Sequence, residues 1–272
     1  MTAITNPHLP VLAADGRLGI GIAPGQGGSG GRLVDLFHAV AQTADASAAA
    51  ARIFAVQRHF AEVLLSTENV AIAEHRLPYI LQGHVSGACT VTWPEHALAS
   101  LSVRAAGSGF LLRGPLHPVP NVGESWYLVT ALLQLRRDRP ASLALLSSEQ
   151  DRLHRAPSGS AESDDCAALI ADDVFFRGDE ILQEDLGKQA AYLGRFATFL
   201  RCAISAGTAR HTVQRMDKGQ RITGQATLTR TINELLRAVQ GRSLPAGLDL
   251  QVASSVLERL AGAAQVLRPA PC

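Results

Sequence analysis

The sequence predicts a multidomain α+β protein, because the spacing of its apolar residues changes twice along the chain. Apolar residues recur at helical spacing over residues 32–82 and again after residue 185. Between them, over 83–178, short β-prone runs are separated by Gly, Pro, Asn or Ser. We therefore expect a helical N-terminal domain at 1–82, a central antiparallel β-barrel or sandwich at 83–184 and a C-terminal helical bundle at 185–272.

Composition narrows the class of protein. With 272 residues, of which 47% are hydrophobic, the chain can build a substantial core. A formal net charge of +1 gives no electrostatic reason to expect nucleic acid or an anionic membrane as a partner. There is no apolar run of about 18 residues, and the N-terminus lacks the basic start and apolar stretch of a signal peptide. We expect a cytoplasmic protein without a membrane span.

Cysteine and histidine spacing predicts neither disulfides nor a metal site. The 4 cysteines lie far apart with no C-x-x-C pair, which fits a reducing compartment. The 9 histidines are scattered, and no pair at helical i, i+4 spacing stands beside a carboxylate. We therefore expect no metal ligands.

Three helices are predicted in the N-terminal region. One apolar stripe is made by Leu33, Phe37, Val40 and Ala41. A second is made by Ile53, Val56, Phe60, Val63 and Leu64, and the oxygens of Asp45 and Ser47 can cap its start. A shorter third helix is expected over 70–81.

Before these helices, Gly25-Gln-Gly-Gly-Ser-Gly30 matches the pattern G-x-G-x-x-G. That pattern holds a pyrophosphate only when a buried strand leads into it and a helix leaves it. A helix does follow, and Asp45 stands at a tolerable distance for holding a ribose. However, the preceding run at 18–23 is short and interrupted by glycines, and no βαβ unit follows. The match is weak evidence for a dinucleotide site.

Strands are predicted at 89–93, 98–103, 109–113, 126–133, 142–146 and around Val174, with a polar loop at 155–165. Helices return with a wide apolar face over 192–204 and narrower stripes over 228–239 and 252–267. Pro245 and Gly247 separate the last two stripes.

The order of these elements and several local strings resemble the acyl-CoA dehydrogenase superfamily of flavoproteins, including its flavin monooxygenase branch. The strings lie at 9–31, 87–94, 109–121, 171–182 and 202–210, and the likeness covers most of residues 9–211. The first resembles the family's loop P-x-x-x-G-G-x-G, which implies that the glycines form a tight connection between helices and not a phosphate cradle. The third resembles G-(W/Y)-x-(L/I)-x-G-x-K-x-W-I-T-N.

This resemblance implies a flavin, FAD with FMN as the alternative, bound between the sheet domain and the C-terminal helices. Carried over by position, the flavin-binding residues are Val91 and Thr92, then Val119 and Pro120. The family's threonine is lost at Pro120, and with it a hydroxyl and an N–H donor. Pro118 likewise stands where the family has a tryptophan that packs against the flavin.

Two further implications concern the C-terminal region. Arg215 begins a string resembling R-x-x-F-G, whose arginine contacts the pyrophosphate of a neighbouring subunit's flavin; a solvated basic turn is the other interpretation. The chain ends at Cys272, before helices that would complete the family's bundle, so we expect an incomplete bundle. Apolar faces at 196–204 and 228–239 would then lack their usual cover, which predicts a homo-oligomer.

Three functions remain open. The first is a flavin-dependent oxidoreductase acting on the CH–CH group of an acyl thioester, which needs a carboxylate base to take the α-proton. The usual position of that glutamate falls in the missing helices, so no catalytic residue is assigned. The second is a flavin monooxygenase acting on a small molecule, which does not need this base. The third is a catalytically inactive relative that serves as a binding or assembly partner.

Overall fold

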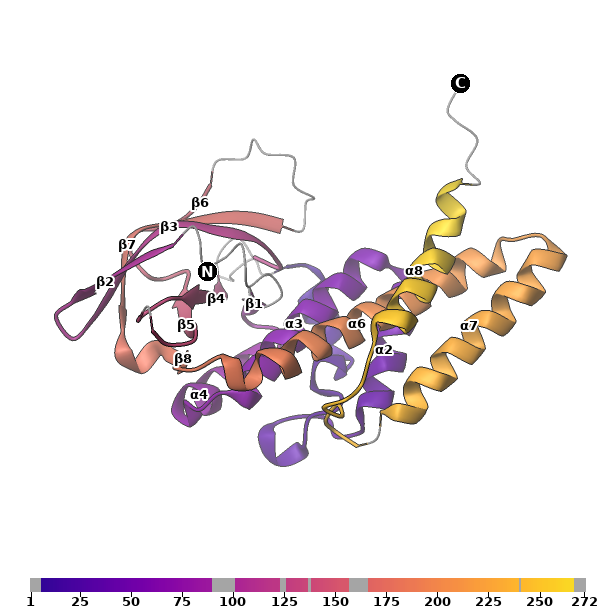
Figure 1. Cartoon of the computed structure of the whole chain (residues 1–272), viewed down its shortest axis with the longest axis horizontal. Coiled ribbons are helices and arrows are strands. Elements are labelled where there is room, and N and C mark those ends of the chain that lie inside the picture. The colour runs from indigo at the N-terminus through magenta and orange to yellow at the C-terminus, as the bar shows by residue number, and fades with distance from the viewer. Residues whose placement is uncertain are drawn as a thin grey trace, which may run out of the picture. The chain divides into compact units, whose positions relative to one another are not determined.

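The computed structural model describes residues 6–89, 101–122, 126–136, 138–156, 166–239 and 241–266. In these residues the chain forms α-helices and two four-stranded sheets, in the order helices, strands, helices (Figure 1). The prediction of an α+β fold is therefore confirmed. No helix among the described residues combines the length and the hydropathy needed to cross a membrane.

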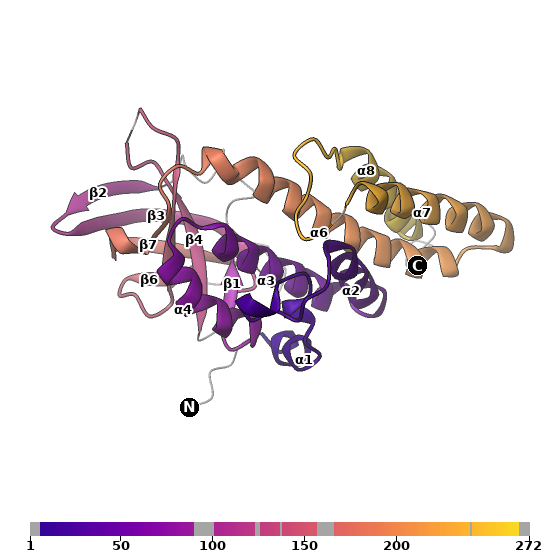
Figure 2. The same cartoon turned by 90° about the horizontal axis from the view of Figure 1, so that it is seen from below.

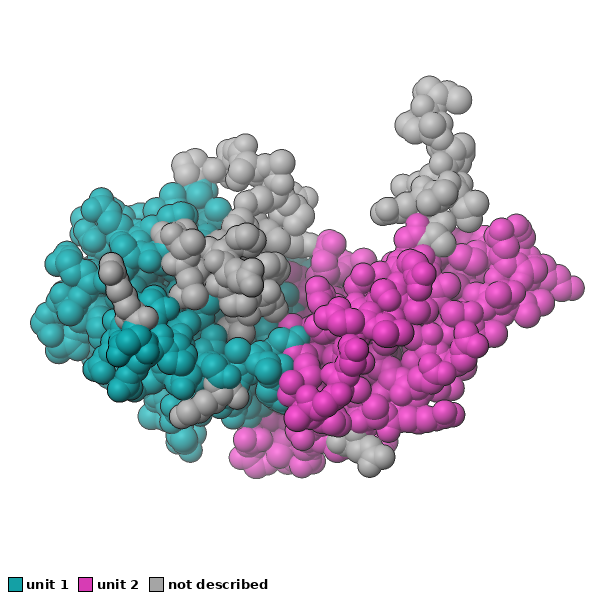
Figure 3. Space-filling view, in the orientation of Figure 1, with its two compact units in different colours: residues 1–18, 56–194 teal, residues 19–55, 195–272 magenta. Residues whose placement is uncertain are grey.

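The chain separates into two compact units (Figure 3). Unit 1 comprises residues 1–18 and 56–194, and unit 2 comprises 19–55 and 195–272. Two long helices, α3 (Ala48–Ser66) and α6 (Gly187–Gln214), contribute residues to both units. The three-domain division with boundaries at residues 82 and 184 stays a prediction.

Unit 1 contains both sheets. The first has the strand order β1 (Ser86–Ala88), β4 (Tyr127–Leu133), β5 (Ser142–Ser147) and β8 (Ile181–Gln183). The second has the order β2 (Ser102–Ala106), β3 (Gly109–Pro120), β7 (Cys166–Arg177) and β6 (Leu153–Arg155). Neighbouring strands are antiparallel except β1 and β4, which pair in parallel with Ser86 opposite Tyr127. The expectation of a purely antiparallel module is wrong at this pair.

One apolar core joins side chains from both sheets. It includes Leu112 and Leu169 from the second sheet and Val129 and Leu146 from the first. All seven residues of β4 are buried and all but Thr130 are apolar, so this strand does not show an alternating apolar and polar pattern. Two sheets that share one core form a sandwich, and the described strands do not close into a barrel.

The helices of unit 1 comprise α1 (His8–Ala14), α4 (Val70–Leu81), the C-terminal part of α3 and the first residues of α6. Asn69 caps α4, since its Oδ1 accepts a hydrogen bond from the Ile72 amide at 3.3 Å. Its Nδ2 donates to the carbonyl oxygens of Asp179 at 2.8 Å and Ile181 at 3.2 Å. One side chain thus starts the helix and ties it to the segment that leads into β8.

The glycine-rich segment belongs to unit 2 and follows no strand. Short 3-10 helices form at Arg17–Gly19 and at Pro24–Gln26, which contains Gly25. The only pairing in the described part of this segment is a bridge between Ile20 and Gly30. A side chain at Gly28 would come within 2.3 Å of the Ile22 carbonyl oxygen. The segment therefore forms a tight connection to the next helix, as the resemblance implies, and not a dinucleotide cradle.

Unit 2 packs α2 (Leu33–Ala46), the rest of α6, α7 (Lys218–Ala238) and α8 (Gln251–Val266) against one another (Figure 2). The rings of Phe37 and Phe199 lie 5.5 Å apart, and Leu228 and Leu235 are buried. The expectation of uncovered apolar faces at 196–204 and 228–239 is wrong, because the chain's own helices cover them. That reason for predicting a homo-oligomer does not hold.

Candidate functional site

The residues that the sequence assigns to a flavin fall in three places. Val91 and Thr92 lie outside the described residues, as does most of the predicted strand at 89–93. Val119 and Pro120 are the last two residues of β3, paired with Ala167 and Cys166 of β7. Arg215 is exposed in the turn between α6 and α7, in unit 2.

A buried network of amide groups joins the segments next to these positions. Gln57 of α3 donates through Nε2 to the carbonyl oxygens of Ile80 at 2.9 Å and Val85 at 2.8 Å. Its Oε1 accepts from the Gly87 amide at 2.8 Å and from Asn121 Nδ2 at 2.7 Å. Asn121 Nδ2 also donates to the Gly87 carbonyl oxygen at 3.0 Å. Gln57 therefore uses all of the hydrogen-bonding capacity of its two donors and its acceptor oxygen.

This network places two distant parts of the sequence side by side. Gly87 lies in β1 and precedes Val91 and Thr92, while Asn121 directly follows Val119 and Pro120. Gln57 and Asn121 are each 1% exposed, so both amides lie in the interior of unit 1. The chain packs closely here, because a side chain at Gly87 would come within 2.4 Å of the Phe60 ring.

Backbone geometry at the end of β3 is irregular. The pairing of β3 with β7 shifts register between Leu116 and Val119, as in a β-bulge. Asn121 then has a φ of 63°, in the left-handed region that asparagine tolerates better than most residues. Bulges and left-handed residues are common next to functional sites, where they redirect the chain.

The described part of the assigned site could contact a flavin, but with a reduced set of donors. Val119 and Pro120 lie beside the amide network, whereas Val91 and Thr92 lie outside the described residues. Pro118 and Pro120 have no N–H, so the main-chain donors at this end of β3 belong to Val119 and Asn121.

A buried ionic cluster lies further along α3. Arg58 Nη1 donates to Glu62 Oε2 at 2.8 Å, and the Tyr192 hydroxyl of α6 donates to Glu62 Oε1 at 2.5 Å. Arg58 is 1% exposed. Both carboxylate oxygens therefore accept hydrogen bonds, and the cluster ties α3 to α6 within unit 1. Sequence reasoning missed it, because the i, i+4 spacing of Arg58 and Glu62 is equally typical of a solvated pair.

His59 stands beside this cluster and is buried. The pKa of His59 is lowered to about 4, mainly because burial disfavours the charged imidazole; a hydrogen bond with the Leu193 backbone raises the pKa, and the nearby positive charge of Arg58 lowers it. The imidazole is therefore neutral in the folded protein at neutral pH. Its charged form occurs mainly in the unfolded chain, where the pKa has its ordinary value.

We expect His59 to lower the free energy of unfolding of the protein in acid. Between pH 6.5 and about 4 the unfolded chain binds a proton that the folded chain does not, so stability falls as pH falls through this window. The wild-type protein should lose about 2 kcal/mol more than His59→Gln between pH 7 and pH 5, since one pKa unit corresponds to about 1.4 kcal/mol. Urea unfolding at both pH values measures this difference. Equal losses in the two proteins would contradict the assignment.

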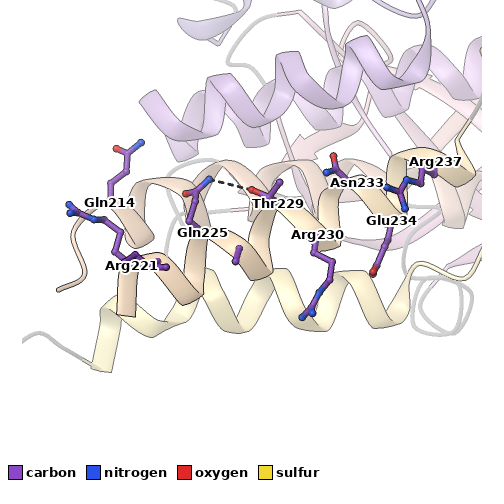
Figure 4. Close-up of a pocket in the computed structure, with 10 residues that line it drawn as sticks. Gln214, Arg221, Gln225, Thr229, Arg230, Asn233, Glu234 and Arg237 are labelled. Atoms are coloured by element: carbon purple, nitrogen blue, oxygen red, sulfur yellow. Dashed lines mark hydrogen bonds between the residues drawn. The ribbon is translucent and has the colours of Figure 1, made fainter. Parts of the chain in front are cut away.

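A separate open groove of about 810 Å³ lies in unit 2, along α7 (Figure 4). It is lined by Gln214, Arg221, Ile222, Gln225, Ala226, Thr229, Arg230, Asn233, Glu234 and Arg237. None of the residues assigned to the flavin lines it. Its polar lining includes a hydrogen bond of 3.4 Å from Gln225 Nε2 to Thr229 Oγ1.

The sequence matches no protein-family model and no curated protein. Solved structures, in contrast, resemble the chain closely in fold. Butyryl-CoA dehydrogenase from Megasphaera elsdenii matches with a TM-score of 0.79 and 17% identity, over 97% of this chain and 79% of that one. FkbI, for biosynthesis of the methoxymalonyl extender unit of Fk520, matches with a TM-score of 0.72 and 17% identity, over 97% and 82% of the two chains. KijD3, in complex with FMN and a dTDP-linked amino sugar, matches with a TM-score of 0.68 and 17% identity, over 96% and 73%.

Proposed function

We propose that this chain, which has the fold of the acyl-CoA dehydrogenase superfamily, is a flavin-dependent oxidoreductase. The observation that carries the proposal is the likeness in fold, along nearly the whole chain, to butyryl-CoA dehydrogenase. When bound, a flavin would supply hydride acceptance from the CH–CH group of an acyl thioester. The protein's part is to bind, orient and shield the reacting groups.

The proposed flavin-binding residues are Val91 and Thr92 on one segment and Val119 and Pro120 on the other. Main-chain groups would do most of the binding, since only Thr92 among these four carries a polar side chain. The amide network of Gln57 and Asn121 supports this assignment, because it joins the chain next to both segments. FAD is the proposed cofactor, and FMN is the alternative because KijD3 is in complex with FMN.

No described residue is assigned as the base that takes the substrate α-proton. Glu62 is a buried carboxylate, but both of its oxygens are engaged by Arg58 and Tyr192. It is therefore a poor candidate for proton transfer. Monooxygenase chemistry, which does not need this base, is an alternative within the same fold.

A non-catalytic binding or assembly partner is the second candidate function. The prolines at 118 and 120 favour it, because they remove two N–H donors and a hydroxyl where the family binds its flavin. Flavin binding separates this candidate from the two enzymatic ones.

Arg215 is proposed to contact the flavin pyrophosphate of a second copy of the chain. It is exposed, and its turn is closed by a hydrogen bond of 3.0 Å from its amide to the Thr212 carbonyl oxygen. A guanidinium in this position can form paired hydrogen bonds with phosphate oxygens. The proposed active form is therefore a homo-oligomer.

Titration with FAD and FMN tests these proposals together. We expect the wild-type protein to quench FAD fluorescence with saturation, and Arg215→Ala to bind FAD roughly tenfold more weakly, equivalent to about 1.4 kcal/mol. FMN has no pyrophosphate, so its affinity should be the same in both proteins. If Arg215→Ala bound FAD and FMN more weakly by the same factor, the proposed contact of Arg215 with the pyrophosphate would be wrong. Absence of saturable binding in the wild type would support the non-catalytic candidate.

A further inference from the structure

We propose that Gln57 and Asn121 are positioning residues for the flavin, acting through the main chain at the end of β3, where Val119 and Pro120 would bind it. The inference rests on the proposed function, since it assigns these two amides to the same site. Neither residue needs to touch the cofactor. Their role is to fix the separation between β1 and the end of β3.

The hydrogen bonds show how this separation is fixed. Asn121 is joined to Gly87 in two ways. Its Nδ2 donates directly to the Gly87 carbonyl oxygen, and Gln57 Oε1 accepts hydrogen bonds from both Asn121 Nδ2 and the Gly87 main-chain amide. Gln57 is itself held by the carbonyl oxygens of Ile80 and Val85. The two strand ends are thus bonded to one side chain, which is anchored in turn at the end of α4.

The cost of this arrangement argues that its geometry matters. Asn121 Oδ1 is buried and has no hydrogen-bond partner in the described structure, although Nδ2 of the same amide makes two bonds. An unsatisfied buried acceptor costs about 1–3 kcal/mol, and the left-handed backbone at Asn121 adds strain. An apolar residue would avoid the first cost but would lose the contacts with Gln57 and Gly87.

Binding through main-chain groups makes such positioning important. Main-chain donors cannot adjust by rotating a side chain, so a displacement of the end of β3 relative to β1 misplaces the donors that the end of β3 carries. Sites that depend on preorganised geometry tolerate displacements of only about 0.5 Å. Residues that orient the ligands of bound metals typically change affinity by 10- to 100-fold when they are replaced, and we expect an effect of roughly that size here.

Asn121→Gly is the main test, because glycine keeps the left-handed backbone and removes only the amide side chain. Gln57→Leu removes the other half of the network. Asn69→Gly is the matched control, since Asn69 also donates through Nδ2 to two main-chain carbonyls but lies next to β8, at the opposite edge of the sheet from β1. Glycine is tolerated at a helix N-cap, so α4 should still form.

The dissociation constant for FAD should rise roughly 10- to 100-fold in Asn121→Gly and in Gln57→Leu, measured well below the melting temperature of each protein. The double variant should bind about as weakly as either single variant, because both remove the same contact. The visible absorption spectrum of bound FAD should also become more like that of free FAD in water. Asn69→Gly should lower the melting temperature and leave both the affinity and the spectrum unchanged.

Two outcomes separate this inference from the proposed function. If the wild type binds FAD and Asn121→Gly binds it with an unchanged dissociation constant and spectrum, the positioning role is wrong and the proposed function stands. If the wild type itself binds no flavin, the proposed function fails. If Gln57→Leu does not fold, the result for Asn121→Gly decides whether the positioning role is right. Gln57→Glu then takes the place of Gln57→Leu, because it keeps an oxygen acceptor for Gly87 and Asn121.

Discussion

Replacing Glu62 with alanine should lower the free energy of unfolding by about 3–5 kcal/mol, because it removes the carboxylate that binds the buried guanidinium of Arg58. Glu62 binds the guanidinium at 2.8 Å, and the side chain of Arg58 is 1% exposed. The variant also removes the acceptor of the Tyr192 hydroxyl, and with it a bond between α3 and α6. Urea unfolding followed by circular dichroism measures the loss.

Two controls make the comparison specific. Tyr192→Phe removes one hydrogen bond to a charged group and should cost about 1.5–3 kcal/mol, less than Glu62→Ala. Asp179→Ala breaks an ion pair in which the side chains of Arg177 and Asp179 are 63% and 68% exposed. This variant should change the free energy of unfolding by less than about 1 kcal/mol. A loss below about 1 kcal/mol in Glu62→Ala would show that the ionic cluster does not support the fold.

Gly207→Ala should destabilise the protein by about 3 kcal/mol, the upper part of the usual range for overpacking. A Cβ at Gly207 in α6 would lie 2.1 Å from the carbonyl oxygen of Ala41 and 2.7 Å from the Ala44 Cβ, both in α2. Rotation of a side chain cannot relieve a clash with a backbone atom, so the two helices would have to separate. The melting temperature and the urea midpoint should both fall.

Gly194→Ala is the control in the same helix. Nothing lies within 4 Å of a Cβ at Gly194, so the variant should gain about 0.5–1 kcal/mol from the higher helix propensity of alanine. The two substitutions are chemically identical and are expected to have opposite signs. A neutral or stabilising Gly207→Ala would mean that α2 and α6 do not pack as closely as described.

Regular apolar spacing predicted the helices well. The third helix was expected over 70–81 and spans Val70–Leu81, and the last was expected over 252–267 and spans Gln251–Val266. The strand at 126–133 also proved nearly correct, as β4. In these segments the period of the apolar residues is set by local geometry, so a single sequence contains the information.

Arrangements that depend on distant parts of the chain were not predicted. The parallel pairing of β1 with β4 joins residues about 40 apart, and no local pattern specifies it. The sequence predicts uncovered apolar faces on α6 and α7, because the cover that α2 and α8 provide cannot be read from each helix alone. Burial by tertiary packing was therefore mistaken for a subunit interface.

The candidate site was predicted in part. The string that ends at Asn121 was identified by resemblance, but the buried bonds of Asn121 to Gln57 and Gly87 were not expected. A signal for Gln57 was present, since this polar residue stands within the apolar stripe of α3, next to Val56 and three residues before Phe60. A polar side chain on a buried helix face must find hydrogen-bond partners.

We propose that this protein binds a flavin through residues 91–92 and 119–120, next to the strands that Gln57 and Asn121 join. The flavin content of the protein purified from cells tests it most directly, measured from the visible spectrum and again after the protein is unfolded and the released cofactor is identified. We expect a yellow protein, or a colourless one that takes up about one FAD per chain when the cofactor is added. A colourless protein that takes up neither FAD nor FMN would contradict it.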